Sequence, residues 1–119
     1  MKALLDSKRV SMASTDRRRH KRYRFSAPIT VRCADGSEKA GMTLEISENG
    51  MSVILADPLL LGETVQLEPV AGTRVSALVR HHVGKVHGVE FLDLTDGQVQ
   101  KIRASCSVLP IYRPKNLNI

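Results

Sequence analysis

Six stretches between residues 28 and 91 alternate apolar and polar side chains. A period of two is typical of β-strands with one face in a core, and the turn sequences "ADG" at 34–36 and "ENG" at 48–50 separate two pairs of strands. The residues predicted to face the core are Ile29, Val31, Cys33, Met42, Leu44, Ile46, Met51, Val53, Leu55, Val65, Leu67, Val75, Ala77, Val79, Val89 and Phe91. Six short antiparallel strands with one apolar face each favour a closed or nearly closed barrel, because closure removes exposed edges.

The period changes after "LDL" at 92–94. Apolar residues then recur at helical spacing, at Val99, Ile102, Cys106 and Leu109. Thr95 and Gln98 match the capping box that begins a helix, and Pro110 is expected to end it. The predicted fold class is therefore mainly all-β: a six-stranded antiparallel β-barrel with a C-terminal α-helix that closes one end and packs Cys106 inward.

The ends of the chain lack this periodicity. Residues 1–16 are polar and mixed and are predicted to form a flexible leader, residues 17–110 the domain, and residues 111–119 a tail. The apolar run in "MKALLDSKRV" is too short for a signal peptide, and no run is long enough to span a bilayer. With only two cysteines, Cys33 and Cys106, we expect a reducing compartment and a cytoplasmic location.

The charge of the chain is concentrated in one short stretch. The formal net charge is +6, yet residues 1–24 hold nine Lys and Arg against two Asp, while residues 25–119 balance to −1. Six of the ten residues in "DRRRHKRYRF" at 16–25 are Lys or Arg. A local basic arm indicates an anionic partner: a phosphate ligand, a nucleic acid or an anionic membrane surface.

Two groups of polar residues could recognise such a partner. Glu45 and Ser47 are predicted on the outer face of the second strand, where a carboxylate and a hydroxyl could read the edge of a guanine. Arg18 and Arg22 are spaced so that a folded arm could grip one ligand with both guanidinium groups, on phosphate or on guanine. On spacing alone, a solvated strand face and a solvated arm would explain the same residues.

Taken together, "RRRHKR" at 17–22, "EISENG" at 45–50 and "GVEF" at 88–91 resemble the PilZ family of bacterial cyclic di-GMP receptors. The family pattern is RxxxR before the first strand, (D/N)xSxxG at a strand and turn, and Gly-x-x-Phe near the last strand of a six-stranded barrel. The resemblance covers roughly residues 16–110, and the order of the motifs agrees with the predicted strands.

The resemblance implies a role for each matching residue. Arg18 and Arg22 would clamp the phosphates and guanine edges of cyclic di-GMP, and Ser47 would be a hydrogen-bond partner. Gly50 would be required by the turn, and Gly88 belongs to the third motif of the site. Arg17 precedes the motif, as in family members that bind a stacked ligand dimer.

One position departs from the family pattern. Glu45 replaces the Asp or Asn and carries its carboxylate one methylene further out. If the carboxylate cannot reach the ligand, the loss of one charge-assisted hydrogen bond costs roughly 1.5 to 3 kcal/mol, or about ten- to a hundredfold in affinity.

The predicted function is a non-catalytic cyclic di-GMP receptor that orders its arginine-rich arm around the ligand and signals to a downstream protein. The alternative is a PilZ-like adaptor that has lost ligand binding. A nucleic-acid binder is disfavoured because four scattered aromatics make no stacking platform. No cofactor is expected. No metal is expected either, since His81 and His82 should face opposite sides of a strand. Catalysis is not expected, because Ser47 has no base partner.

Overall fold

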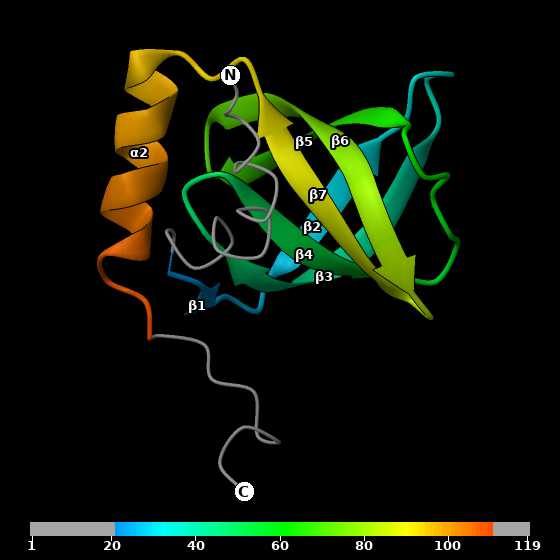
Figure 1. The fold of residues 1–119 in the computed structure, drawn as a ribbon, viewed down its shortest axis with the longest axis horizontal. Helices are drawn as coiled ribbons and strands as arrows, with labels where there is room; N and C mark the ends of the chain where they lie inside the picture. Colours follow the sequence, from blue (N-terminus) through cyan, green and yellow to red (C-terminus); the bar gives the residue numbers. More distant parts are fainter. Residues whose placement is uncertain (1–20, 111–119) are drawn as a thin grey trace, which may run out of the picture.

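The computed structural model describes residues 21–110, which form a β-barrel with one helix beside it (Figure 1). The elements are β1 (Tyr23–Arg24), β2 (Pro28–Arg32), β3 (Glu38–Ile46), β4 (Gly50–Leu55), β5 (Thr64–Val70), β6 (Thr73–Val83), β7 (Val86–Leu92) and α2 (Asp96–Cys106). Six antiparallel strands close in the order β3-β2-β5-β6-β7-β4, and β4 pairs back onto β3. The predicted six-stranded barrel is confirmed.

Side-chain alternation fills the barrel interior. Val31, Val53 and Ala77 are fully buried, on strands that lie far apart in the sequence. The helix α2 begins with the predicted capping box of Thr95 and Gln98. It stands at the left of the barrel in Figure 1, and its residues Ile102 and Cys106 join the core of the barrel. No helix within residues 21–110 combines the length and the apolarity that a membrane crossing requires.

The strand β3 contains a β-bulge between Thr43 and Glu45 that corrects the predicted register. Before the bulge, Met42 is 41% exposed and Thr43 only 3%, so the prediction that Met42 and Leu44 face the core with Ile46 is wrong. The bulge inserts one residue and so reverses the alternation. Beyond it, Ile46 points inward and Glu45 outward, as predicted.

The buried hydroxyl of Thr43 fixes the path of the chain that enters the barrel. It donates to the carbonyl of Phe25, and it accepts from the amide of Ala27 at 2.8 Å. The amide of Thr43 in turn donates to the carbonyl of Ala27 at 2.8 Å. A buried polar side chain inside the strand is thereby satisfied, and the segment before β2 is held against β3.

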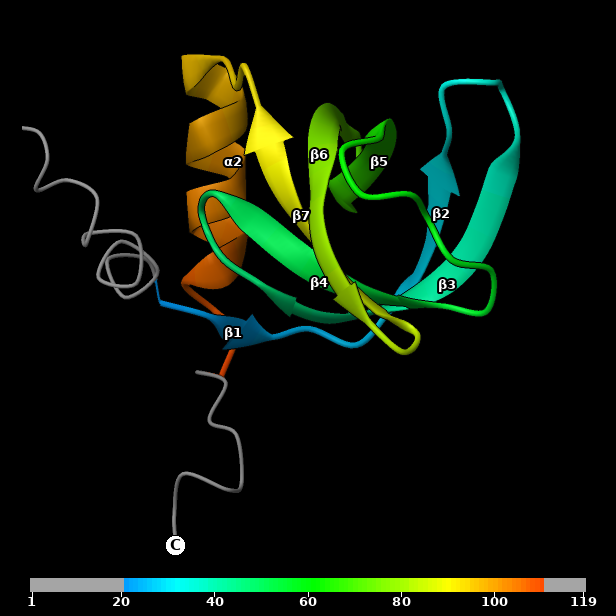
Figure 2. The same cartoon turned by 45° about the vertical axis from the view of Figure 1, so that its right-hand side comes forward.

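The two-residue strand β1 was not expected, because the strand pattern of the sequence begins only at Pro28. Tyr23 pairs with Ile46 and Arg24 with Glu45, at the end of β3. The amide of Arg24 also donates to the carbonyl of Pro110 at 2.8 Å, so β1 lies between β3 and the chain that follows α2 (Figure 2). Two residues are too few to show a period, so no pattern in the sequence could predict this strand.

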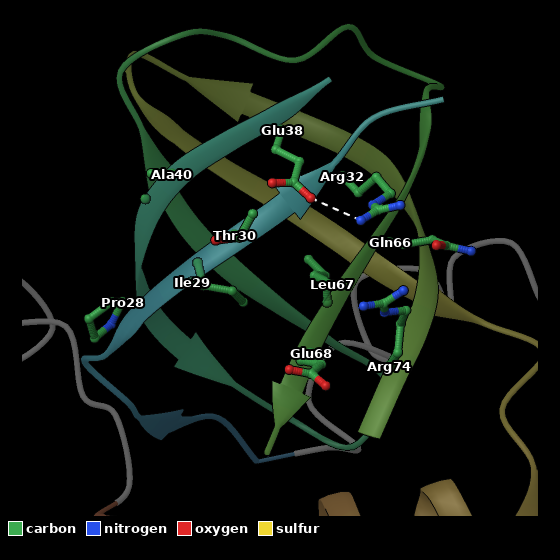
Figure 3. A pocket seen from close by; sticks show the side chains of 11 residues that line it. Pro28, Ile29, Thr30, Arg32, Glu38, Ala40, Gln66, Leu67, Glu68 and Arg74 are labelled. Carbon is green, nitrogen blue, oxygen red and sulfur yellow. Dashed lines mark hydrogen bonds and ion pairs between the residues drawn. The ribbon is translucent and has the colours of Figure 1, made fainter. Parts of the chain in front are cut away.

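The weakest junction of the barrel lies between β2 and β5, which pair only at Arg32 and Gln66. Beyond this pair the strands separate around a pocket of about 470 Å³ (Figure 3). Ile29 and Leu67 are among the buried residues that line it. The ion pair between Arg32 and Glu38 crosses from β2 to β3 at 3.0 Å beside this pocket.

His87 is a structural histidine in the core. It is fully buried, its Nε2 accepts from the amide of Leu59 at 3.0 Å, and its Nδ1 lies 2.9 Å from the carbonyl of Lys85. These partners require the neutral ring with the proton on Nδ1. Burial lowers the pKa of His87 below its ordinary value of 6.5, with the nearby His82 adding to the effect.

His87 therefore makes the stability of the domain depend on pH. Because its pKa is lower in the folded state, the unfolded chain takes up the proton first as the pH falls below about 6.5, and stability is lost by up to about 1.4 kcal/mol per pH unit. Urea unfolding of the His87→Gln variant should show a lower free energy of unfolding at pH 7.5 but a flatter dependence between pH 7 and 5. His81→Gln, on the exposed face, is the control; equal pH slopes in all three proteins would contradict this assignment.

Candidate functional site

A pocket of about 350 Å³ lies on the outer face of the barrel and brings together most of the residues singled out in the sequence. Five predicted site residues line it: Arg22, Glu45, Ser47, Gly50 and Gly88. They come from the arm, from the end of β3, from the turn after it, and from β4 and β7. The other two, Arg17 and Arg18, lie outside the described residues.

Glu45 is the most enclosed charged group of this pocket. Its side chain is 12% exposed, its Oε2 accepts from the hydroxyl of Ser52 at 3.0 Å, and the same oxygen lies 3.5 Å from Nη1 of Arg22. Its other oxygen, Oε1, is buried and has no hydrogen-bond partner in the described part of the chain. A buried carboxylate oxygen without a donor is costly, so a ligand N–H that reaches this oxygen when the pocket rearranges would bind favourably.

Ser47 and Asn49 hold the turn that leads from β3 to β4. The hydroxyl of Ser47 donates to Oδ1 of Asn49 at 2.7 Å and lies 3.3 Å from the amide of Asn49. The amide of Ser47 donates to the carbonyl of Gly50 at 2.8 Å. Ser47 is itself buried, at 8% exposure, so in this structure its hydroxyl supports the wall of the pocket.

Gly50 ends the turn and begins β4, and its φ is not positive. Its carbonyl closes the turn by accepting from the amide of Ser47. A Cβ at this position would overlap the carbonyl oxygen of Val89 on the neighbouring strand β7. The glycine therefore allows the close approach of two backbones under the pocket.

Gly88 has a similar role on the pocket floor. A Cβ at Gly88 would overlap the imidazole ring of His81, its partner across the β6–β7 pair. The ring of His81 thus lies over the bare backbone of Gly88. The ring covers this backbone, since Gly88 is buried, and both residues line the pocket.

Two ion pairs at the edge of the pocket fix its surroundings. Arg80 Nε lies 2.7 Å from Oε1 of Glu90, between β6 and β7. Arg103 of α2 makes two hydrogen bonds with the carboxylate of Glu48, at 3.1 and 3.2 Å, and this carboxylate raises the pKa of Arg103. The second pair ties the turn after β3 to the helix.

Sequence reasoning missed Ser52, His81 and Arg80, which also line the pocket. The alternation of β4 did place Ser52 outward, but only the register shows that it lies opposite Glu45 and beside Gly88. Within residues 21–110, no group of three or more His, Cys, Asp or Glu could hold a metal ion. Both cysteines are buried, and burial raises the pKa of Cys106 to about 11.

Comparison with solved structures shows the same fold in three other proteins. The PilZ domain of CeSA from a cellulose-synthesizing bacterium is 18% identical, with a TM-score of 0.58, over 72% of this chain and 94% of that one. The PilZ domain of YcgR from Escherichia coli, solved with c-di-GMP, is 16% identical, with a TM-score of 0.62, over 78% and 91%. MotI/DgrA, an inhibitor of motility from Bacillus subtilis, is 20% identical, with a TM-score of 0.60, over 83% and 51%.

Comparison with curated proteins finds no matching relative. The family model of the PilZ domain, in contrast, matches residues 16–107, which include the basic arm, the barrel and the helix. This match covers more than half of the chain and contains all three motifs noted in the sequence. The chain belongs to the PilZ domain family.

Proposed function

We propose that this protein is a non-catalytic receptor for cyclic di-GMP, which binds in the pocket between the arm, β3, β4 and β7. The observation that carries the proposal is the buried Oε1 of Glu45, an acceptor without a donor in a pocket that also contains Arg22. Guanine offers N–H donors on one edge, and its O6 and N7 accept from arginine. The pocket therefore offers the Glu45 carboxylate to the N–H edge of guanine and the Arg22 guanidinium to its O6 and N7.

The position of Arg22 supports a clamp built from the arm. Its side chain is 45% exposed, and the ion pair with Glu45 holds its guanidinium at the pocket. The next residue, Tyr23, is fixed to β3, so the arm starts at the pocket. Four residues of chain reach at most about 14 Å, which keeps Arg18 within that distance of Arg22 in any conformation.

The proposed mechanism is ordering of the arm around an anionic ligand. Arg17, Arg18 and Arg22 would neutralise the two phosphates, and the bases would rest on the wall formed by β4 and β7. A second, stacked ligand is expected from the presence of Arg17. The ligand and the arm together then form a new surface for a downstream protein, as expected of a signalling domain.

The alternative function is an adaptor that has lost its ligand. The ion pair between Arg22 and Glu45 favours this alternative, because each side chain already neutralises part of the charge of the other. Calorimetric titration with cyclic di-GMP separates the two, with GTP and a DNA oligomer as controls. Binding of cyclic di-GMP alone, at one or two molecules per chain, supports the receptor, and no heat with any of the three supports the adaptor.

Removal of either clamp arginine should weaken binding. Arg18→Ala and Arg22→Ala each lose a charge-assisted contact of about 1.5 to 3 kcal/mol, so the dissociation constant for cyclic di-GMP should rise tenfold or more. Arg32→Ala is the matched control, since Arg32 lies at the β2–β5 junction and does not line the proposed ligand pocket. Equal affinities in all variants would show that the arm does not clamp the ligand.

Shortening Glu45 should strengthen binding. In Glu45→Asp the carboxylate withdraws from Arg22, which frees the guanidinium for phosphate, and the acceptor returns to the position that the family motif gives it. We expect affinity to rise by about threefold to a hundredfold, the equivalent of up to roughly 3 kcal/mol. The measurement is calorimetric titration.

Glu45→Ala serves as the control for that substitution. It frees Arg22 but removes the acceptor for the guanine edge, so it should bind more weakly than Glu45→Asp. Identical titrations of the wild type and both variants would mean that Glu45 takes no part in binding.

A further inference from the structure

The outer face of the barrel carries two parallel rows of side chains across the same four strands. One row consists of Glu45, Ser52, Gly88 and His81, which are cross-strand partners on β3, β4, β7 and β6 and line the pocket described above. The second row consists of Met42, Ile54, Val86 and Val83, which are partners on the same strands. On β4, β7 and β6 the rows lie two residues apart, or about 7 Å.

The second row, which we call the apolar row, is exposed although all four side chains are aliphatic or thioether. Met42 is 41% exposed, Ile54 37%, Val86 36% and Val83 80%. Directly opposed partners in antiparallel strands have Cβ atoms about 4.5 to 5.5 Å apart, so the four side chains form one continuous strip. Single exposed apolar residues are common on protein surfaces, but a contiguous strip indicates a binding surface.

The topology restricts what could bind the apolar row. At the apolar row β3, β4 and β7 are each paired on both sides, so they offer no free edge for an added strand. The pairing of β6 with β5 ends at Val79, so residues 80–83 have one open edge, but a strand added there would lie beside Val83 and would not cover the other three side chains. A partner that covers the whole row must therefore contact side chains. Neighbouring strands are about 4.8 Å apart, and the apolar positions on one face of a helix recur about every 5.4 Å along its axis. A helix laid across the strands would thus place about one apolar side chain over each strand.

Charge indicates the character of the partner. The β6–β7 hairpin, which supplies Val83 and Val86, carries Arg80, His81, His82 and Lys85 from residue 79 to residue 89 and no acidic residue. Arg80 is paired with Glu90, whereas no described carboxylate lies within ion-pair distance of Lys85. Lys85 sits in the turn, on the side of the apolar row away from the pocket. Two copies that face each other with their rows parallel would bring their basic hairpins together, which disfavours that mode of self-association.

We propose that the apolar row is the docking surface for an amphipathic helix of a partner protein, with an acidic flank that faces Lys85. This surface lies beside the proposed ligand pocket but is complete without a ligand. A titration with a partner mimic and no cyclic di-GMP therefore tests it independently of the proposed function.

The test uses a pair of synthetic peptides of about 15 residues, stapled into helices on their outer face. Both carry leucines at positions i, i+4, i+7 and i+11, and one flank is glutamate in the first peptide and lysine in the second. The glutamate peptide should bind more tightly, and methyl NMR shifts should centre on Met42, Ile54, Val83 and Val86. Val83→Glu should weaken its binding tenfold or more without affecting the fold, because Val83 is mostly exposed.

Two further variants test the role of the Lys85 charge and the location of the binding surface. Lys85→Glu should reverse the preference so that the lysine peptide binds more tightly. Val108→Glu changes an equally exposed valine beyond α2 and should leave binding as in the wild type. The proposal would be overturned if neither peptide bound, if both bound equally, or if the shifts centred on Leu60 and Leu61. It would also be overturned if the protein dimerised through this row, or if it bound phosphatidylserine vesicles in place of the peptide.

Discussion

The site depends on one irregularity in the sheet, the bulge of β3 between Thr43 and Glu45. Without the extra residue, a strand that buries Ile46 would also bury Met42 and expose Thr43. With it, Thr43 turns inward and binds the chain that follows the arm, while Glu45 turns outward into the pocket. A single inserted residue thus brings the segment that follows the arm and the carboxylate of Glu45 together at the end of β3.

The contacts around the pocket also connect it to the rest of the domain. Arg103 holds Glu48 in the turn after β3, and the carbonyl of Pro110, just after the helix, accepts from the amide of Arg24 in β1. The helix and the segment after it therefore hold the two pieces of chain that border the pocket, the turn and the base of the arm. A change in the position of the arm would therefore act on the segment after α2 through the hydrogen bond between Arg24 and Pro110.

The alternation of apolar residues was sufficient to predict the six strands, the barrel and the capped helix, because closure and burial constrain each strand on one face. It could not predict the bulge, since Met42 and Leu44 fit an alternating strand as well as Thr43 does. The motifs assigned Arg22, Glu45 and Gly88 to one site, and the three residues line one pocket. The contributions of Ser52 and His81 depend on strand register, and this is fixed by pairings far apart in the sequence.

The open junction between β2 and β5 has a consequence for the motions of the barrel. Pro28 and Pro69 lie on its two strands and lack the amide hydrogen that pairing would use, so neither this junction nor a foreign strand can readily complete the ladder there. Local opening costs least where the fewest contacts are broken. The barrel can therefore open at this junction while β3, β4, β7 and β6 stay paired as one curved sheet, so that breathing of the fold does not disturb the surface on which ligand and partner would lie.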